Sequence, residues 1–178
     1  MSYFSKMRGI TKSPPRAALS EVAWSFMGAF LGISAVGYIN YSLLEPPGNV
    51  LMFGPFGASA VLIYGVIKSP LAQPRNLLGG HILAALIGVA AYKIFSPNLW
   101  LAASVAVALA VATMHLTRTL HPPAGATALI AVIGDEKIHS LGFAYAAYPV
   151  AAGVIVMLVI ALLFNNVARN RRYPEFWF

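Results

Sequence analysis

Six long apolar stretches that contain no Asp, Glu, Lys or Arg follow one another along this chain and limit the folds open to it. They cover residues 22–44, 46–67, 76–92, 94–117, 119–134 and 138–168. Hydrophobic residues make up 59% of the 178 positions, and 12 basic and 5 acidic residues occupy the short segments between the stretches. A soluble domain needs a surface that is roughly a quarter or more charged. We therefore predict an all-α integral membrane protein, with the lipid bilayer covering most of its surface.

Four of the stretches predict ordinary transmembrane helices, at about residues 23–43, 77–95, 99–116 and 143–164. Each is close to the roughly 20 residues that a helix needs to cross a bilayer. The segments 45–69 and 119–135 differ, because each combines a proline-rich start with a short apolar run. Proline ends a preceding helix, so we expect these two segments to be broken or re-entrant.

The two unusual segments resemble each other. The residues from Pro55 to Leu62 align without gaps on those from Pro123 to Ile130, with a shared Pro-x-Gly-Ala-Ser/Thr-Ala core. Such a match can arise by chance in a chain rich in Ala and Gly. The equivalent position of each copy between two ordinary helices favours an internal duplication. We predict two inverted repeats of helix, broken helix and helix, at about 19–95 and 97–165, within a transmembrane domain of residues 19–168.

Basic residues predict the topology. If both broken segments cross the bilayer, ten of the 12 Lys and Arg residues fall on one side, and only Lys93 and Lys137 fall on the other. If both segments only dip in and return, the division is eight against four. The positive-inside rule favours six crossings, and either arrangement leaves both termini in the cytoplasm. We expect a multi-pass protein of a bacterial inner (plasma) membrane, with a basic leader (1–18) and a basic tail (169–178).

Composition and motifs argue against several functions. The formal charge of +7 comes from residues at the ends of apolar segments, without the basic face and interleaved aromatics of a nucleic-acid-binding protein. The chain has no cysteine, which excludes thiolate metal sites. It also lacks the common hydrolase, metalloprotease and Walker motifs. We expect no enzyme activity, no metal and no cofactor.

The paired motif predicts a site for a small inorganic anion. A helix that begins inside the membrane presents unpaired N–H groups and the positive end of its dipole. Proline suits the first position of such a helix, and small residues let a ligand approach the backbone. The candidate substrate-binding residues are Pro55, Gly57, Ala58, Ser59, Arg118, His121, Pro122, Pro123, Gly125, Ala126 and Thr127. The alternative is that the glycines and alanines only allow close helix packing, and Arg118 can equally be an interfacial anchor.

Two histidines are candidates for gating or proton transfer. His121 directly precedes the two prolines, and His81 lies inside an apolar stretch after two glycines. An ionisable residue within the membrane is a functional hypothesis by default, and histidine titrates near neutral pH. The alternatives are a structural hydrogen bond at the helix interruption for His121 and simple packing for His81.

The string from His121 to Leu129, with Gly54–Ala60 and the stretch from Pro74 to His81, resembles the HPP family of integral membrane proteins. The likeness covers roughly residues 21–164. It implies transport, because plant plastid and cyanobacterial relatives are associated with nitrite. The family is usually described with four transmembrane helices, which the charge count questions. The leading hypothesis is a nitrite-like anion transporter or channel, with a homo-oligomer as an allowed assembly. The alternative is a non-transporting membrane scaffold or assembly protein.

Overall fold

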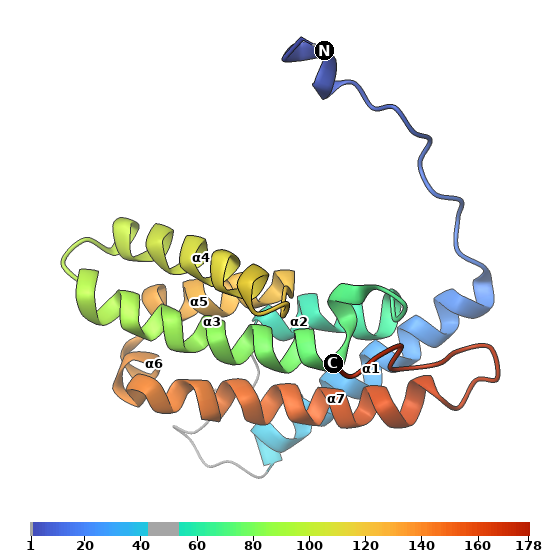
Figure 1. Ribbon diagram of the computed structural model, residues 1–178. Helices are drawn as coiled ribbons and strands as arrows, with labels where there is room; N and C mark the ends of the chain where they lie inside the picture. Colours follow the sequence, from blue (N-terminus) through green and yellow to red (C-terminus); the bar gives the residue numbers. More distant parts are fainter. Residues whose placement is uncertain (1, 43–53) are drawn as a thin grey trace.

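The computed structural model describes residues 2–42 and 54–178, and this part of the chain is helical without strands (Figure 1). Four helical spans are long and apolar enough to cross a membrane. They are α1 (Leu19–Ser42), α3 (Pro74–Phe95), α4 (Leu99–Leu116) and the composite span Glu136–Asn165. The predicted all-α membrane fold with four full spans is therefore confirmed. The proline-rich start of the first broken segment, 45–53, lies outside the described residues.

Short elements complete the fold. The first broken segment contains α2 (Gly54–Ala60) and the π-helix η2 (Val61–Gly65), and the 3-10 turn η3 (Pro70–Ala72) leads into α3. The second broken segment is α5 (Pro122–Ile133), which begins with Pro122 and Pro123 in its first turn. The last span comprises α6 (Glu136–Leu141), η4 (Gly142–Ala146), η5 (Ala147–Ala151) and α7 (Ala152–Asn165). A further 3-10 turn, η1 (Phe4–Met7), lies in the basic leader.

The fourth span corrects the sequence prediction in one respect. An ordinary helix was expected over residues 143–164, but Tyr148 interrupts it with φ −137° and ψ 126°. The physical reason is Pro149, since proline disfavours the helical conformation in the residue before it. Only α7 continues as a regular α-helix from there to Asn165.

The basic residues gather at opposite ends of the bundle, which we name the Arg171 end and the Lys93 end. At the Arg171 end, Arg171 lies near Glu21 at the start of α1, and Arg75 donates to the Thr117 carbonyl after α4. At the Lys93 end, the ring of Tyr92 stacks on His139, and Lys93 lies over the ring of Phe143. In Figure 1 the Arg171 end is on the right, with the starts of α1 and α3 and the end of α7.

The helices α2 and α5 run in opposite directions. The start of α5 lies beside Gly80 and its later part beside Gly88, so α5 runs with α3 toward the Lys93 end. The helix α2 and η2 run the other way, and η2 ends near the start of α3 at the Arg171 end (Figure 1). This arrangement is what inverted repeats with crossing segments require. The duplication itself stays a prediction.

The core is built from small side chains where α3, α4 and α5 meet. Ala84, Ala102, Ala106, Ala110 and Ala128 are all completely buried. Helices in a bilayer associate by close van der Waals packing, which small residues permit. In contrast, Phe26 and Phe30 of α1 and other large apolar residues are exposed on the outside. These surfaces suit contact with lipid chains.

The two ends should be distinguishable by labelling, because any introduced cysteine is the only one in the chain. Lys68 and Lys137 are both exposed, at the Arg171 end and the Lys93 end respectively. In sealed membranes, an impermeant maleimide should label Lys68→Cys only from the side of the N-terminal leader, and Lys137→Cys only from the opposite side. Labelling of both variants from one side would contradict the six-crossing topology.

Candidate functional site

Four side chains form a continuous hydrogen-bonded chain in the centre of the bundle. Ser59 Oγ lies 2.8 Å from His81 Nε2 and 2.9 Å from His121 Nε2. His81 Nδ1 lies 2.7 Å from Thr127 Oγ1, and His121 Nδ1 lies 2.8 Å from the Leu71 carbonyl oxygen. All four side chains have 0% exposure. We call Thr127, His81, Ser59 and His121 the central polar chain.

The Leu71 carbonyl fixes the direction of every bond in this chain when both histidines are neutral. A carbonyl oxygen only accepts, so His121 carries its hydrogen on Nδ1 and Nε2 is an acceptor. Ser59 must therefore donate to His121 and accept from His81 Nε2–H. His81 Nδ1 is then an acceptor, and the Thr127 hydroxyl donates to it. In the neutral state all donors point from Thr127 toward Leu71.

The sequence brings these side chains together through the two broken segments. Ser59 and Thr127 occupy the same position in the two copies of the paired motif, four residues after Pro55 and Pro123. His81 lies between them on α3 and contacts both hydroxyls. The paired motif therefore places two equivalent hydroxyls within hydrogen-bonding distance of one imidazole, that of His81.

The turn before α5 positions His121. The side chain of Asn76 donates to the Leu120 carbonyl at 2.8 Å, which holds the turn against α3. His121 itself has an extended backbone (φ −138°, ψ 102°) at the helix start, as expected for a residue before proline. Close approach depends on Gly80, where a Cβ would lie 2.8 Å from both His121 Cβ and the Thr119 carbonyl oxygen. The two glycines before His81 thus have a packing role.

Aromatic and small residues surround the central polar chain. The two imidazole rings are 5.0 Å apart between centroids, and Phe56 packs edge-on at 6.0 Å from His81. Tyr145 of η4 donates to the Thr127 backbone carbonyl at 3.1 Å. Within residues 2–42 and 54–178, no carboxylate, amine or guanidinium is hydrogen-bonded to the chain of four. The described groups of the site are therefore polar but uncharged when both histidines are neutral.

The structure brings together some of the predicted site residues and separates others. Buried at or beside the central polar chain are Pro55, Ser59, His81, His121, Pro123 and Thr127. On the outside of the isolated chain are Gly57, Ala58, Pro122 and Ala126, with Gly125 half-buried. Arg118 is exposed in the turn after α4, with a φ of 58°. Their contact with a substrate stays a prediction, but the hydroxyls and imidazoles form one unit and the Gly-Ala pairs do not.

Sequence reasoning missed the central role of His81 and the partners Leu71 and Tyr145. The signal for His81 was present, because it is an intramembrane histidine at the end of a Gly-Gly-His string. No pattern identified Leu71, since its contribution is a backbone carbonyl. Tyr145 was one of several aromatics in the last span.

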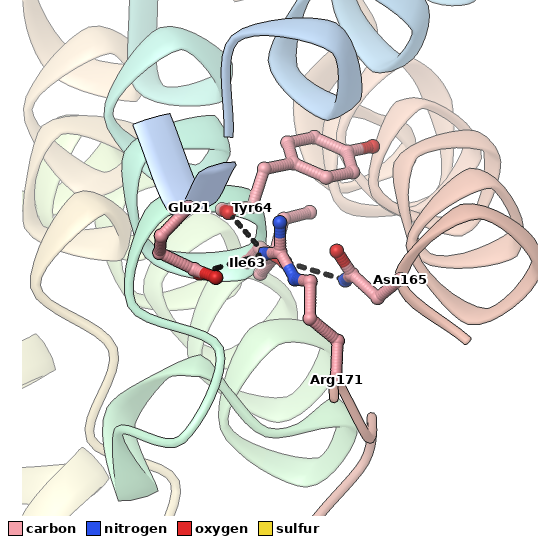
Figure 2. Close-up of polar contacts among 5 residues, drawn as sticks. All are labelled: Glu21, Ile63, Tyr64, Asn165 and Arg171. Atoms are coloured by element: carbon pink, nitrogen blue, oxygen red, sulfur yellow. Dashed lines mark hydrogen bonds and ion pairs between the residues drawn. The ribbon is translucent and has the colours of Figure 1, made fainter. Parts of the chain in front are cut away.

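A second polar cluster closes the Arg171 end (Figure 2). Arg171 Nη2 donates to the Tyr64 carbonyl at 2.6 Å and lies 3.6 Å from Glu21 Oε1, and Asn165 donates to the Ile63 carbonyl at 2.9 Å. Burial lowers the pKa of the Arg171 guanidinium, and the Glu21 carboxylate opposes that shift. A cavity of about 540 Å³ adjoins this cluster and is lined in part by Lys68 and Ser69. The C-terminal tail is thereby tied to the start of α1 and to η2.

The central polar chain is suited to holding or passing a proton, because imidazole and hydroxyl groups both donate and accept. A metal is a poorer match. The described residues contain no group of three or more His, Asp or Glu side chains arranged to hold a metal ion.

Comparison with known proteins gives one family and two close relatives. The sequence model of a protein family, the HPP transmembrane region, matches residues 14–174 of the chain. Two transmembrane proteins of Dictyostelium discoideum are 45% and 42% identical to the chain over 180 and 182 residues, each covering 99% of it. The chain spans 58% and 64% of the length of these relatives. No solved structure matches the chain.

Proposed function

The chain belongs to the HPP family of transmembrane proteins, and we propose that it is a transporter or channel for a small inorganic anion. Nitrite is the first candidate, followed by nitrate and bicarbonate. The observation that carries the proposal is the central polar chain, in which two histidines and two hydroxyls are fully buried among apolar transmembrane helices. Ionisable residues are costly in a bilayer and are typical of substrate and proton pathways.

The position of the central polar chain within the bundle also favours transport. It lies where two short helices of opposite direction, α2 and α5, meet the long helix α3. Discontinuous helices near the middle of the membrane form the substrate sites of many transporters. The first turn of α5 adds the positive end of a helix dipole close to His121.

The distribution of charge favours an anion over a metal cation as the substrate. The described carboxylates, Glu21, Asp135, Glu136 and Glu175, all lie at the ends of the bundle or in the tail. Hard cations prefer carboxylate and carbonyl oxygens, whereas imidazole and hydroxyl hydrogens are donors that suit an anion. Proton uptake by a histidine would add positive charge at the same place.

Two other functions fit the chain less well. A membrane scaffold can use small residues for packing, but it has no need of a buried histidine pair. A serine beside histidine is also the arrangement of acyl-transfer enzymes. Ser59 is completely buried, and the described residues place no carboxylate on either histidine to orient it as a base.

The proposal also includes the orientation of the protein in the membrane and its location. We place the Arg171 end and both termini on the cytoplasmic side, because that end carries most of the basic residues. The bacterial inner membrane stays a prediction, since the relatives described above are from Dictyostelium discoideum. The small exposed residues of α2 and α5 give a face on which a second copy could pack.

Anion uptake into liposomes containing the purified protein tests the proposal, with Ser59→Ala and Ser104→Ala as a matched pair. Ser59→Ala removes the common partner of two buried imidazoles, and each unpaired buried polar group costs about 1–3 kcal/mol. We expect nitrite uptake to fall at least about ten-fold, since 1.4 kcal/mol is a factor of ten. Ser104 is exposed and bonds only to the Trp100 carbonyl in its own helix, so its variant should transport normally. Uptake by the unmodified protein no faster than in empty liposomes, for every anion tried, would exclude transport of these anions.

A further inference from the structure

The central polar chain can take up one proton without losing a hydrogen bond, whereas a second proton would place two positive rings 5.0 Å apart. In the neutral state Thr127 donates to His81, His81 to Ser59, Ser59 to His121, and His121 to the Leu71 carbonyl. If a proton enters at the Thr127 hydroxyl, three transfers carry the charge to His121: the Thr127 hydrogen passes to His81 Nδ1, the His81 Nε2 hydrogen passes to Ser59 Oγ, and the Ser59 hydrogen passes to His121 Nε2. His121 Nε2–H then donates to Ser59, Ser59 donates to His81 Nε2, and His81 Nδ1–H donates to Thr127.

The proton balance of this change is simple. One proton enters, and His121 becomes an imidazolium that still donates from Nδ1 to Leu71. His81 remains neutral and exchanges one tautomer for the other. The polarity of the three bonds between Thr127 and His121 is reversed. Thr127 keeps the incoming proton as its hydroxyl hydrogen, which then points to an acceptor outside the chain of four.

The protonated state carries a charge that the part of the chain described by the structure does not balance. Within residues 2–42 and 54–178, the titratable groups at the site are the two imidazoles and, across the Thr127 carbonyl, Tyr145 of η4. The hydrogen bonds and ring contacts of the two imidazoles join them to Ser59 and Phe56 of α2, to Thr127 of α5 and to the Leu71 carbonyl of η3. None of these carries a negative charge. A buried charge without a partner is strongly unfavourable, so an anion is needed to stabilise the imidazolium.

From this geometry we infer that the central polar chain is a proton-binding site, and that a proton and a monovalent anion occupy the protein together and cross the membrane as a neutral pair. The inference rests on the proposed function and adds the coupling ion and the stoichiometry. Linkage requires that if the proton strengthens anion binding, the anion strengthens proton binding by the same factor. The transport rate should therefore depend on the pH gradient and not on the membrane voltage, because the pair carries no net charge.

Proteoliposomes with a trapped pH-sensitive dye and a potassium–valinomycin voltage clamp test the inference in the unmodified protein. Sodium nitrite is the probe, and empty vesicles give the rate at which nitrous acid crosses lipid unaided. After that rate is subtracted, we expect one proton to enter with each nitrite, and uptake to rise when the outside is more acidic. A change of the clamped voltage should leave the rate unchanged. Nitrite uptake without proton entry, or with a rate that follows voltage, would overturn the inference while leaving an anion transporter or channel in place.

His121→Asn and His115→Asn extend the test to single residues. The asparagine amide at position 121 can keep the bond to Leu71 but cannot take up a proton, so proton-coupled uptake should fall at least about ten-fold, because the positive member of the neutral pair is lost. His115 is exposed on α4 and outside the central polar chain, so its variant should retain coupled uptake. Undiminished one-to-one coupling in His121→Asn would show that the proton is held elsewhere. If this variant does not fold, the stoichiometry of the unmodified protein decides the matter alone. If no anion moves at all, the proposed function fails first.

Discussion

Replacing Gly88 by alanine should destabilise the folded protein by about 1–3 kcal/mol or more, the range for overpacked cores. A Cβ at this position would lie 2.5 Å from the Ala128 carbonyl oxygen and 2.9 Å from its Cα. These are backbone atoms of α5, so no side-chain rotation relieves the contact, and α5 must move away from α3. Thr127 would move with it and lose its bond to His81. Thermal unfolding in detergent, followed by size-exclusion chromatography, measures the effect.

Gly125→Ala is the matched control for this substitution. It makes the same chemical change on the helix that packs against Gly88, but a Cβ there meets no atom within 4 Å. Alanine also favours a helix over glycine by up to about 1 kcal/mol. We therefore expect unchanged or slightly higher stability for Gly125→Ala. Equal stability of the two variants would mean that α3 and α5 do not pack as described.

Replacing Thr127 by aspartate should abolish anion transport, with a loss of at least about a hundred-fold and a protein that still folds. The carboxylate would lie where Thr127 Oγ1 now is, 2.7 Å from His81 Nδ1. It would accept a hydrogen from that nitrogen and pair with the positive charge of the protonated chain. A charge-assisted hydrogen bond is worth about 1.5–3 kcal/mol, which is roughly ten- to a hundred-fold, and repulsion of the incoming anion adds to it. The protein would then hold its proton permanently and exclude the substrate.

Nitrite uptake measured in Thr127→Asp and Thr127→Ser separates this effect from a simple loss of packing. Serine keeps the hydroxyl that bonds His81, so its variant should retain most of the activity. Both proteins should elute as single species in detergent. Normal transport by Thr127→Asp would place the anion site away from the central polar chain, whatever its effect on stability.

Local residue patterns were sufficient to predict the membrane class, three of the helical spans and the location of the unusual segments. Long stretches without charge can only be covered by lipid, and proline at positions 122 and 123 marks the start of α5 because it lacks the N–H that a helix interior requires. The interruption at Tyr148 could also be read from Pro149, although a continuous helix was expected there. These are properties of single residues and their immediate neighbours, which local sequence encodes.

Which of the candidate residues form one site depends on how the helices pack, and no local pattern reveals it. The pairing of Ser59 with Thr127 was visible as a repeat, but the residue that joins them, His81, comes from another helix. The Leu71 carbonyl, which fixes the direction of the whole hydrogen-bonded chain, has no side-chain signature at all. The outward position of Gly57, Ala58 and Ala126 was equally hidden, since small residues suit a ligand, a neighbouring helix or another copy alike. Hydrogen bonds between residues 22 to 62 positions apart depend on how the helices pack, and packing is a property of the whole chain.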